Sequence, residues 1–336
     1  MNIIIHRGTH QIGGSAIEIS TASTRIILDF GNELSLDEKY TPINLDIDGV
    51  TKGILDCDGI VISHYHMDHL GQLTSALPEI PLYMGELSKE VAMIATEHQD
   101  KDLYLRLLDA NTFRGGEAFT IGNIHIRPLV IDHSAVDSYM FVIEAEGKRV
   151  LYTGDFRMHG LRSHVVEKLV KTYIGEVDVL ITEGTSLSRN AHDGISERDV
   201  LDDISSYIQD GKYVFIMCSS TNIDRIMGIW HNMPTDKVLI CDAYQKRILD
   251  TVIDNVYYDS TLYRRPDSPL VLDIGAYPKY YMDNGFVSLA RGTENYISEI
   301  KKFPKDDVRI IYSMWIGYIE ENLALKTLLE TYPTYI

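Results

Sequence analysis

The segment VISHYHMDHLGQ, residues 61–72, constrains this chain more than any other part of its sequence. It overlaps the apolar run GIVIS, which predicts a buried strand, so His64 begins the loop at the carboxyl end of that strand. This end of a strand is where α/β sheets place their ligands. His64 and His66 are two positions apart, and an extended segment would point both imidazoles to one side.

Asp68 and His69 complete a group of three histidines and one aspartate, where the chain turns into a helix expected to start near Leu70. Neutral imidazole and carboxylate are the ligands of zinc and similar metals. A polar loop in which the histidines occur by chance is the alternative. Because three histidines gather at one strand end, the pattern favours a metal site.

Composition narrows the classes of protein to which the chain can belong. The chain has 336 residues, 45% of them hydrophobic and 24% charged, which is typical of a globular protein with two domains or one enlarged domain. No apolar segment approaches the ~20 residues that span a bilayer, so no membrane partner is expected. The N-terminus carries no export signal, and the three cysteines, Cys57, Cys218 and Cys241, lack CxxC spacing. We therefore expect buried, reduced thiols in a cytoplasmic protein.

Apolar runs bounded by turn residues predict the strands. SYMFVIEAEGKRVLYTGD predicts two strands joined by a turn at Glu146-Gly147. SERDVLDDISSYIQDG predicts a helix that is capped at Ser196 and ends at Gly211. The other predicted strands lie in NIIIHRG, TRIILDFG, GIVIS, VDVLITEGT, KYVFIMCSS, KVLICDA, PLVLDIG and VRIIYSMW.

The order of these elements changes near Gly184. Before it, short strands follow one another with hairpin turns. After it, strands alternate with helices, which is typical of a parallel sheet covered on both faces. We therefore expect an α/β protein with domains at residues 1–190 and 191–336.

The His-x-His-x-Asp-His motif and the LGQ that follows it resemble the signature loop of the metallo-β-lactamase superfamily. HRGTHQIGGSAIEI with IILDFG resembles the opening hairpin of that fold, where Asp29 closes the second strand. His133, in VIDHSAVDSY, and Asp155, in YTGDFRMHG, follow in the expected order. Taken alone, His133 reads as an ordinary loop residue and Asp155 as a helix cap. The resemblance implies a metallo-β-lactamase αββα sandwich that binds metal.

Two metal ions are implied by the resemblance, with Asp155 bridging them. Zinc is the expected metal, and manganese is the alternative. The implied ligands are His64, His66 and His133 for the first ion, and Asp68 and His69 for the second.

The part of the chain after Asp155 resembles the β-CASP nucleases, particularly ribonuclease J and the cleavage and polyadenylation endonucleases. LITEGTS places Glu183 at a strand end, where that family has an acidic residue that supports the metal site. VFIMCSSTNIDRI resembles a strand-loop-helix of the family, and small residues at a helix N-terminus suit a phosphate. Helix capping alone is the alternative for this loop. The expected phosphate contacts are Ser219, Ser220, Asn222 and Arg225. The fold implied is thus a sandwich with an inserted β-CASP α/β domain.

β-CASP nucleases continue past the inserted domain with a Ser-Gly-His segment and a further histidine. One of these histidines binds the second metal, and another acts near the scissile phosphate. This chain has no histidine after His231 and ends at LLETYPTYI. We therefore expect a fragment that lacks the return to the first domain, and a weak second metal site. A naturally short protein is the alternative.

The resemblance implies hydrolysis of RNA phosphodiester bonds, in RNA processing or decay, with Asp68 and Glu183 as catalytic residues. Asp68 would orient the nucleophile, and Glu183 would fix a metal ligand without touching the substrate. A hydrolase of a small ester or thioester is one alternative. A non-catalytic RNA-binding or regulatory protein with a degraded second metal site is another. The oligomeric state, a homo-oligomer included, stays open.

The net charge of −18 argues against an RNA substrate, because proteins that bind nucleic acid through electrostatics tend to be basic. Bound metal cations would attract a phosphate locally in spite of the acidic composition. The charge objection therefore applies to the whole surface more than to the expected site.

Overall fold

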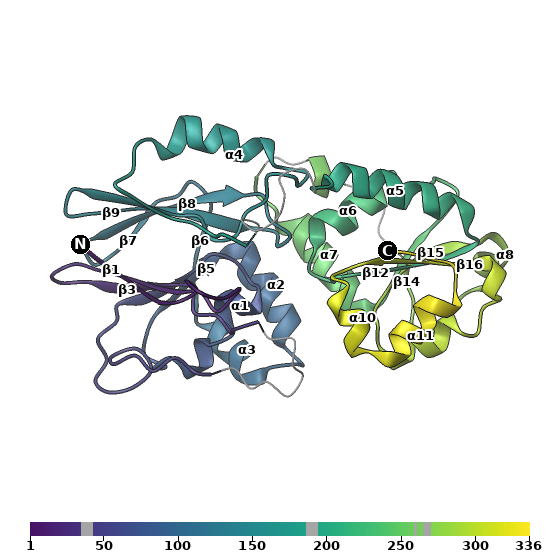
Figure 1. Cartoon of the computed structure of the whole chain (residues 1–336), viewed down its shortest axis with the longest axis horizontal. Helices are drawn as coiled ribbons and strands as arrows, with labels where there is room; N and C mark the ends of the chain where they lie inside the picture. Colours follow the sequence, from purple (N-terminus) through teal and green to yellow (C-terminus); the bar gives the residue numbers. More distant parts are fainter. Residues whose placement is uncertain (35–42, 186–193, 259–260, 265–269) are drawn as a thin grey trace. The chain divides into compact units, whose positions relative to one another are not determined.

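The computed structural model describes residues 1–34, 43–185, 194–258, 261–264 and 270–336. The chain forms two compact units, Met1–Gly194 and Ile195–Ile336. The expected boundary between residues 190 and 191 lies outside the described residues. Both units mix helices and strands, which confirms the α/β class (Figure 1).

Two sheets form the centre of the first unit, and side chains from both sheets pack into one buried cluster between them. The first sheet has the order β1-β2-β3-β4-β5-β6 and is parallel from β3 onward. Its strands are β1 (Asn2–Arg7), β2 (Ala16–Ser20), β3 (Arg25–Leu28), β4 (Gly59–Ile62), β5 (Leu82–Gly85) and β6 (Asn111–Phe113).

The second sheet has the order β11-β10-β9-β8-β7 and is antiparallel except for the β10–β11 pair. Its strands are β7 (Phe119–Ile121), β8 (Ile124–Ile131), β9 (Ser138–Ala145), β10 (Lys148–Tyr152) and β11 (Val179–Ile181). The turn between β9 and β10 is at Glu146-Gly147, as predicted, and both residues have positive φ, of 51° and 69°.

Helices cover the outer faces of the two sheets, which gives the predicted αββα layers (Figure 1). The first sheet is covered by α2 (Glu86–Thr96) and α3 (Lys101–Leu108). The second is covered by α4 (His164–Leu169), whose buried Val166 and Leu169 pack with residues of β8, β9 and β10. The short helix α1 (Met67–Leu70) follows β4.

The second unit is built on one parallel sheet with the order β14-β13-β15-β12-β16-β17. The expected parallel sheet is therefore confirmed. Its strands are β12 (Tyr213–Cys218), β13 (Leu239–Cys241), β14 (Leu270–Val271), β15 (Phe286–Ala290), β16 (Val308–Ser313) and β17 (Thr334–Tyr335).

Helices lie on both faces of this parallel sheet (Figure 1). The first of them, α5, has the predicted cap, because the Ser196 and Asp199 side chains each accept a backbone N–H of the other residue. On the opposite face, α9 and α11 contribute to the main buried cluster. The helices are α5 (Glu197–Asp210), α6 (Ile223–Asn232), α7 (Ala243–Asn255), α8 (Lys279–Asn284), α9 (Glu294–Ile300), α10 (Gly317–Glu321) and α11 (Leu323–Thr331). In the described part of the chain, no helix has the length and apolar character needed to cross a membrane.

The structure differs from the sequence-based expectation at the first helix and at several strands that were not predicted, among them β5, β6, β7, β15 and β17. The helix expected to start near Leu70 begins at Met67 and ends at Leu70, because His66 (φ −71°, ψ 146°) is the last residue in the extended conformation before it. Strand β15 was not predicted, because FVSLA is short and lacks a clear alternation. Its position between β13 and β12 buries all of its residues.

Candidate metal centre

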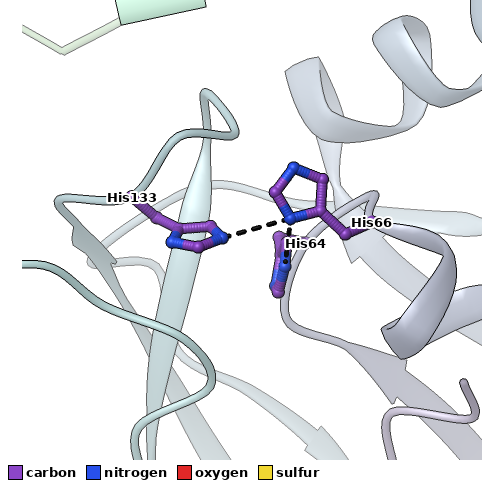
Figure 2. Close-up of side chains that lie close together, drawn as sticks. All are labelled: His64, His66 and His133. Atoms are coloured by element: carbon purple, nitrogen blue, oxygen red, sulfur yellow. Dashed lines mark hydrogen bonds between the residues drawn. The ribbon is translucent and has the colours of Figure 1, made fainter. Parts of the chain in front are cut away.

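Three histidines from two loops converge at one end of the first unit. His64 and His66 follow β4, and His133 follows β8. His64 Nε2 lies 3.1 Å from His66 Nδ1, and His133 Nε2 lies 3.2 Å from the same atom. Figure 2 shows the three rings turned toward one another, with dashed lines from His66 to each of the other two. A third histidine, from the loop after β8 of the second sheet, thus joins the two histidines of the segment that predicted a metal site.

The spacing of these nitrogens fits a metal ion. Metal–nitrogen bonds of about 2.0–2.1 Å in a tetrahedron place ligand atoms about 3.3 Å apart. The ligand atoms of the three histidines all lie within 4.8 Å of one another. Burial and the neighbouring imidazoles lower the pKa of His64 and His133 well below the usual value. Burial also lowers the pKa of His66 to about 4, so all three rings favour the neutral form that metals bind.

A second group lies beside the first and consists of His64, His69 and Asp155. His69 Nε2 is 3.3 Å from Asp155 Oδ1 and 3.7 Å from Asp68 Oδ2. Asp68 belongs to neither group of converging ligand atoms among the described residues, so its role as a ligand stays a prediction. His69 and Asp155, which were expected at the second metal, do come together.

The charged residues around this second group favour the binding of a cation. Burial would lower the pKa of His69, but Asp29 and Asp155 outweigh it and raise that pKa well above its usual value. Burial would raise the pKa of Asp155, but the hydrogen bond and charge of His69 lower it to about 2. Burial raises the pKa of Asp68. The carboxylates therefore stabilise positive charge here, whether a proton on His69 or a metal cation.

Asp29 organises this site, a role that the sequence did not indicate. Its buried carboxylate lies 2.7 Å from His69 Nδ1 and accepts hydrogen bonds from the Ser63 backbone N–H and from the hydroxyl groups of Ser63 and Tyr152. Ser63 Oγ also lies 3.0 Å from His64 Nδ1. Such partners on the far ring nitrogen orient a metal-binding histidine. The available signal was an aspartate at the end of a buried strand, here with a φ of 55°.

Glu183 supports the loop that carries Asp155. Its Oε1 accepts a hydrogen bond of 2.8 Å from the backbone N–H of Phe156. Burial raises the pKa of Glu183. The contact is with the residue that follows Asp155, and the indirect role of Glu183 at the metal site stays a prediction.

A cleft of about 740 Å³ opens beside the second group. Asp68, His69, Asp155 and Glu183 line it together with the loop at residues 8–13. Its other lining side chains include Ile5, Ile12 and Leu34, which are 44%, 57% and 59% exposed. The cleft gives a substrate access to the acidic side of the site.

The expected phosphate contacts lie in the second unit, at the N-terminus of α6. Ser219 Oγ is 3.2 Å from the Thr221 hydroxyl, and the Ser220 carbonyl accepts a hydrogen bond from Gln245. Asn222 is the N-cap residue of α6 and makes no side-chain capping bond.

Arg225 requires a correction. Its guanidinium binds both carboxylate oxygens of Glu197 and donates to the Ser313 hydroxyl at 2.9 Å. Burial would lower the pKa of Arg225, but the bond to Glu197 outweighs it and raises that pKa. This side chain therefore joins α6 to α5 and β16, where the sequence had suggested a phosphate contact.

Comparison with known proteins defines the class of this fold and site. Residues 25–203 match the family described as Beta-lactamase superfamily domain. This match spans more than half of the chain and includes every residue of the two groups, namely His64, His66, His69, His133 and Asp155. The chain therefore belongs to the β-lactamase superfamily.

Curated relatives lie among the ribonucleases of this superfamily. The chain is 27% identical over 223 residues to an RNase J-like protein of Methanocaldococcus jannaschii, covering 63% of this chain and 49% of the relative. It is 25% identical over 281 residues to Endoribonuclease YSH1 of Gibberella zeae, covering 77% and 32%. It is 26% identical over 160 residues to Ribonuclease J of Helicobacter pylori, covering 45% and 22%. These matches support the expected ribonuclease J-like classification. The chain spans about half or less of each relative's length.

A solved structure has the same fold. A protein of unknown function from Enterococcus faecalis V583 superposes with a TM-score of 0.77 at 16% sequence identity. The match covers 99% of this chain and 87% of the other. At this identity the similarity supports the fold of both units and carries no statement on activity.

Proposed function

We propose that this chain is a metal-dependent hydrolase of β-CASP type that cleaves RNA phosphodiester bonds. The observation that carries the proposal is the convergence of His64, His66 and His133 on one point, with His69 and Asp155 beside them. The names of the relatives supply the substrate, because they are ribonucleases. The three cysteines are free and buried, which supports the expected cytoplasmic location.

Two ligand sets follow from this proposal. His64, His66 and His133 would hold a first zinc or manganese ion, and His69 and Asp155, with Asp68, a second. When bound, such ions lower the pKa of a water and polarise a phosphoryl oxygen. Asp68 is in neither group of converging ligand atoms among the described residues, so we expect the second ion to bind more weakly.

The protein's own groups would keep this site in a fixed geometry. Asp29 holds His69 through Nδ1, which leaves Nε2 directed at Asp155. Glu183 holds the backbone that follows Asp155. Asp68 lines the cleft and would orient the attacking nucleophile by a hydrogen bond. Ser219, Ser220 and Asn222 remain proposed contacts for a phosphate.

Turnover by metal-loaded protein tests this proposal. A 5′-monophosphorylated, labelled single-stranded RNA and a panel of thioesters would be incubated with the zinc-loaded and the manganese-loaded chain. The control is the double variant His64→Ala/His66→Ala, which removes two ligands of the first ion. We expect RNA cleavage that needs added metal and is lost in the double variant.

Two results would contradict the proposal. Thioester turnover without RNA cleavage would favour the small-molecule hydrolase. RNA binding without turnover of any substrate would favour the non-catalytic RNA-binding protein.

A further inference from the structure

Tyr65 connects the two loops that carry the three histidines. It stands between His64 and His66 in the sequence, and its side chain is 6% exposed. Its hydroxyl oxygen accepts a hydrogen bond of 2.8 Å from the backbone N–H of Val136, in the loop that follows His133. Its ring also meets the His66 ring edge-on, with centroids 5.7 Å apart and an interplanar angle of 90°.

This contact crosses from one sheet of the sandwich to the other. His64 and His66 follow β4 of the first sheet, whereas His133 lies between β8 and β9 of the second. A second hydrogen bond of 3.1 Å runs from the N–H of Tyr139, at the start of β9, to the Ser63 carbonyl, and also joins the two sheets. The loop of His133 has other bonds as well, because Asp132 accepts the N–H groups of Arg157 and Arg162 and Asp137 accepts that of Ser88. The Tyr65 hydroxyl ties this loop to the segment that carries His64 and His66.

His133 needs such support more than His64 and His69 do. The far ring nitrogens of His64 and His69 lie within hydrogen-bonding distance of Ser63 and Asp29. His133 Nδ1 is buried and has no hydrogen-bond partner among the described residues. Since no partner on its own ring orients this imidazole, its position depends on the loop that carries it.

We propose that Tyr65 is a positioning residue of the metal centre, which acts through the Val136 N–H to hold His133 in place for the first metal. The inference rests on the proposed function, because it assumes that the three histidines bind a metal. It concerns metal affinity, so it is tested without an RNA substrate.

Cobalt(II) titration, followed by visible absorption, tests this role in the full chain. Tyr65→Phe keeps the ring that packs on His66 and removes only the hydroxyl. We expect cobalt to bind about 10–100-fold more weakly, the range seen for outer-shell partners of metal ligands. The absorption spectrum should also change, since the ligand geometry is less well fixed. Tyr213→Phe is the matched control, because it removes a buried hydroxyl that donates to the Met282 carbonyl in the second unit.

A double-mutant cycle identifies the residue through which Tyr65 acts. In a His133→Ala background, Tyr65→Phe should have little further effect on cobalt affinity, because the ligand that it positions is gone. If Tyr65→Phe weakens cobalt binding equally in the wild-type and the His133→Ala background, Tyr65 does not act through His133. Equal cobalt affinity of the wild-type chain and Tyr65→Phe would also contradict the proposal. Failure of the wild-type chain to bind cobalt would instead overturn the metal centre itself, and this inference with it.

Hydrogen exchange of backbone amides tests the proposal on the wild-type chain, so it does not require that a variant folds. The Val136 amide should be protected in the wild-type chain and become more protected when cobalt is added, because metal and hydrogen bond stabilise one arrangement. Fast exchange of this amide with and without cobalt would overturn the proposal.

Discussion

His69 Nδ1 lies 2.7 Å from Asp29 Oδ2, and the two residues are 40 positions apart in the sequence. Tyr152, which lies on the other sheet, donates a hydrogen bond of 2.5 Å to the same carboxylate oxygen. Asp29 therefore links both sheets to a histidine of the candidate second metal site.

Asp29→Asn should weaken both folding and metal binding. Asparagine tolerates the positive φ of this position, so the backbone can be retained. The amide cannot replace the charge and all the acceptor sites of the carboxylate, and a buried donor left without a partner costs about 1–3 kcal/mol. We expect the free energy of unfolding in urea to fall by about 2 kcal/mol and the second metal to bind more weakly. Asp178→Asn, at an exposed pair with Lys148, is the control and should leave metal binding unchanged. Unchanged stability in Asp29→Asn would contradict this role.

Glu183 should act through its acceptor oxygen. Glu183→Gln keeps an oxygen for the Phe156 N–H, whereas Glu183→Ala removes it. We expect Ala to lower RNA cleavage by about 10²-fold, because the loop of Asp155 loses its support, and Gln to retain most of the rate. Cleavage assays at saturating metal measure this difference. If Gln and Ala lose the same activity, the charge of Glu183 matters and the positioning role is wrong.

Arg225 and Glu197 should contribute stability to the second unit. Their side chains are 18% and 2% exposed, so Glu197→Ala leaves a largely buried guanidinium without its carboxylate. We expect this change to lower the free energy of unfolding by roughly 2–4 kcal/mol, somewhat less than for a fully buried pair. Urea denaturation of Glu197→Ala and of Glu197→Leu/Arg225→Met measures it, and the apolar double variant should recover much of the loss. An RNA affinity that falls in Arg225→Met, with stability unchanged, would restore the phosphate contact that the sequence suggested.

The sequence predicted those residues of the site that follow a strand in a local pattern. His64, His66 and His69 share one short segment at the end of a strand, so the local pattern located them. His133 and Asp155 each follow an apolar run, and only the resemblance to the superfamily identified them as ligands. The parallel sheet of the second unit followed from its alternating helices and strands in the same way.

Long-range partners could not be predicted. The Asp29–Tyr152 bond joins residues 123 positions apart, and the Arg225–Ser313 bond joins residues 88 apart. The sequence around Arg225 does not show whether its side chain forms an internal ion pair or contacts a phosphate at the surface. Its partner, Glu197, belongs to a helix whose packing on α6 only the fold determines.

Anomalous diffraction at the zinc absorption edge, from crystals grown with zinc, tests the metal centre most directly. The account predicts a strong peak about 2.0–2.1 Å from His64 Nε2, His66 Nδ1 and His133 Nε2, with a weaker peak or none between His69 and Asp155. A map with no peak among the three histidines, or with its main peak at other residues, would contradict it.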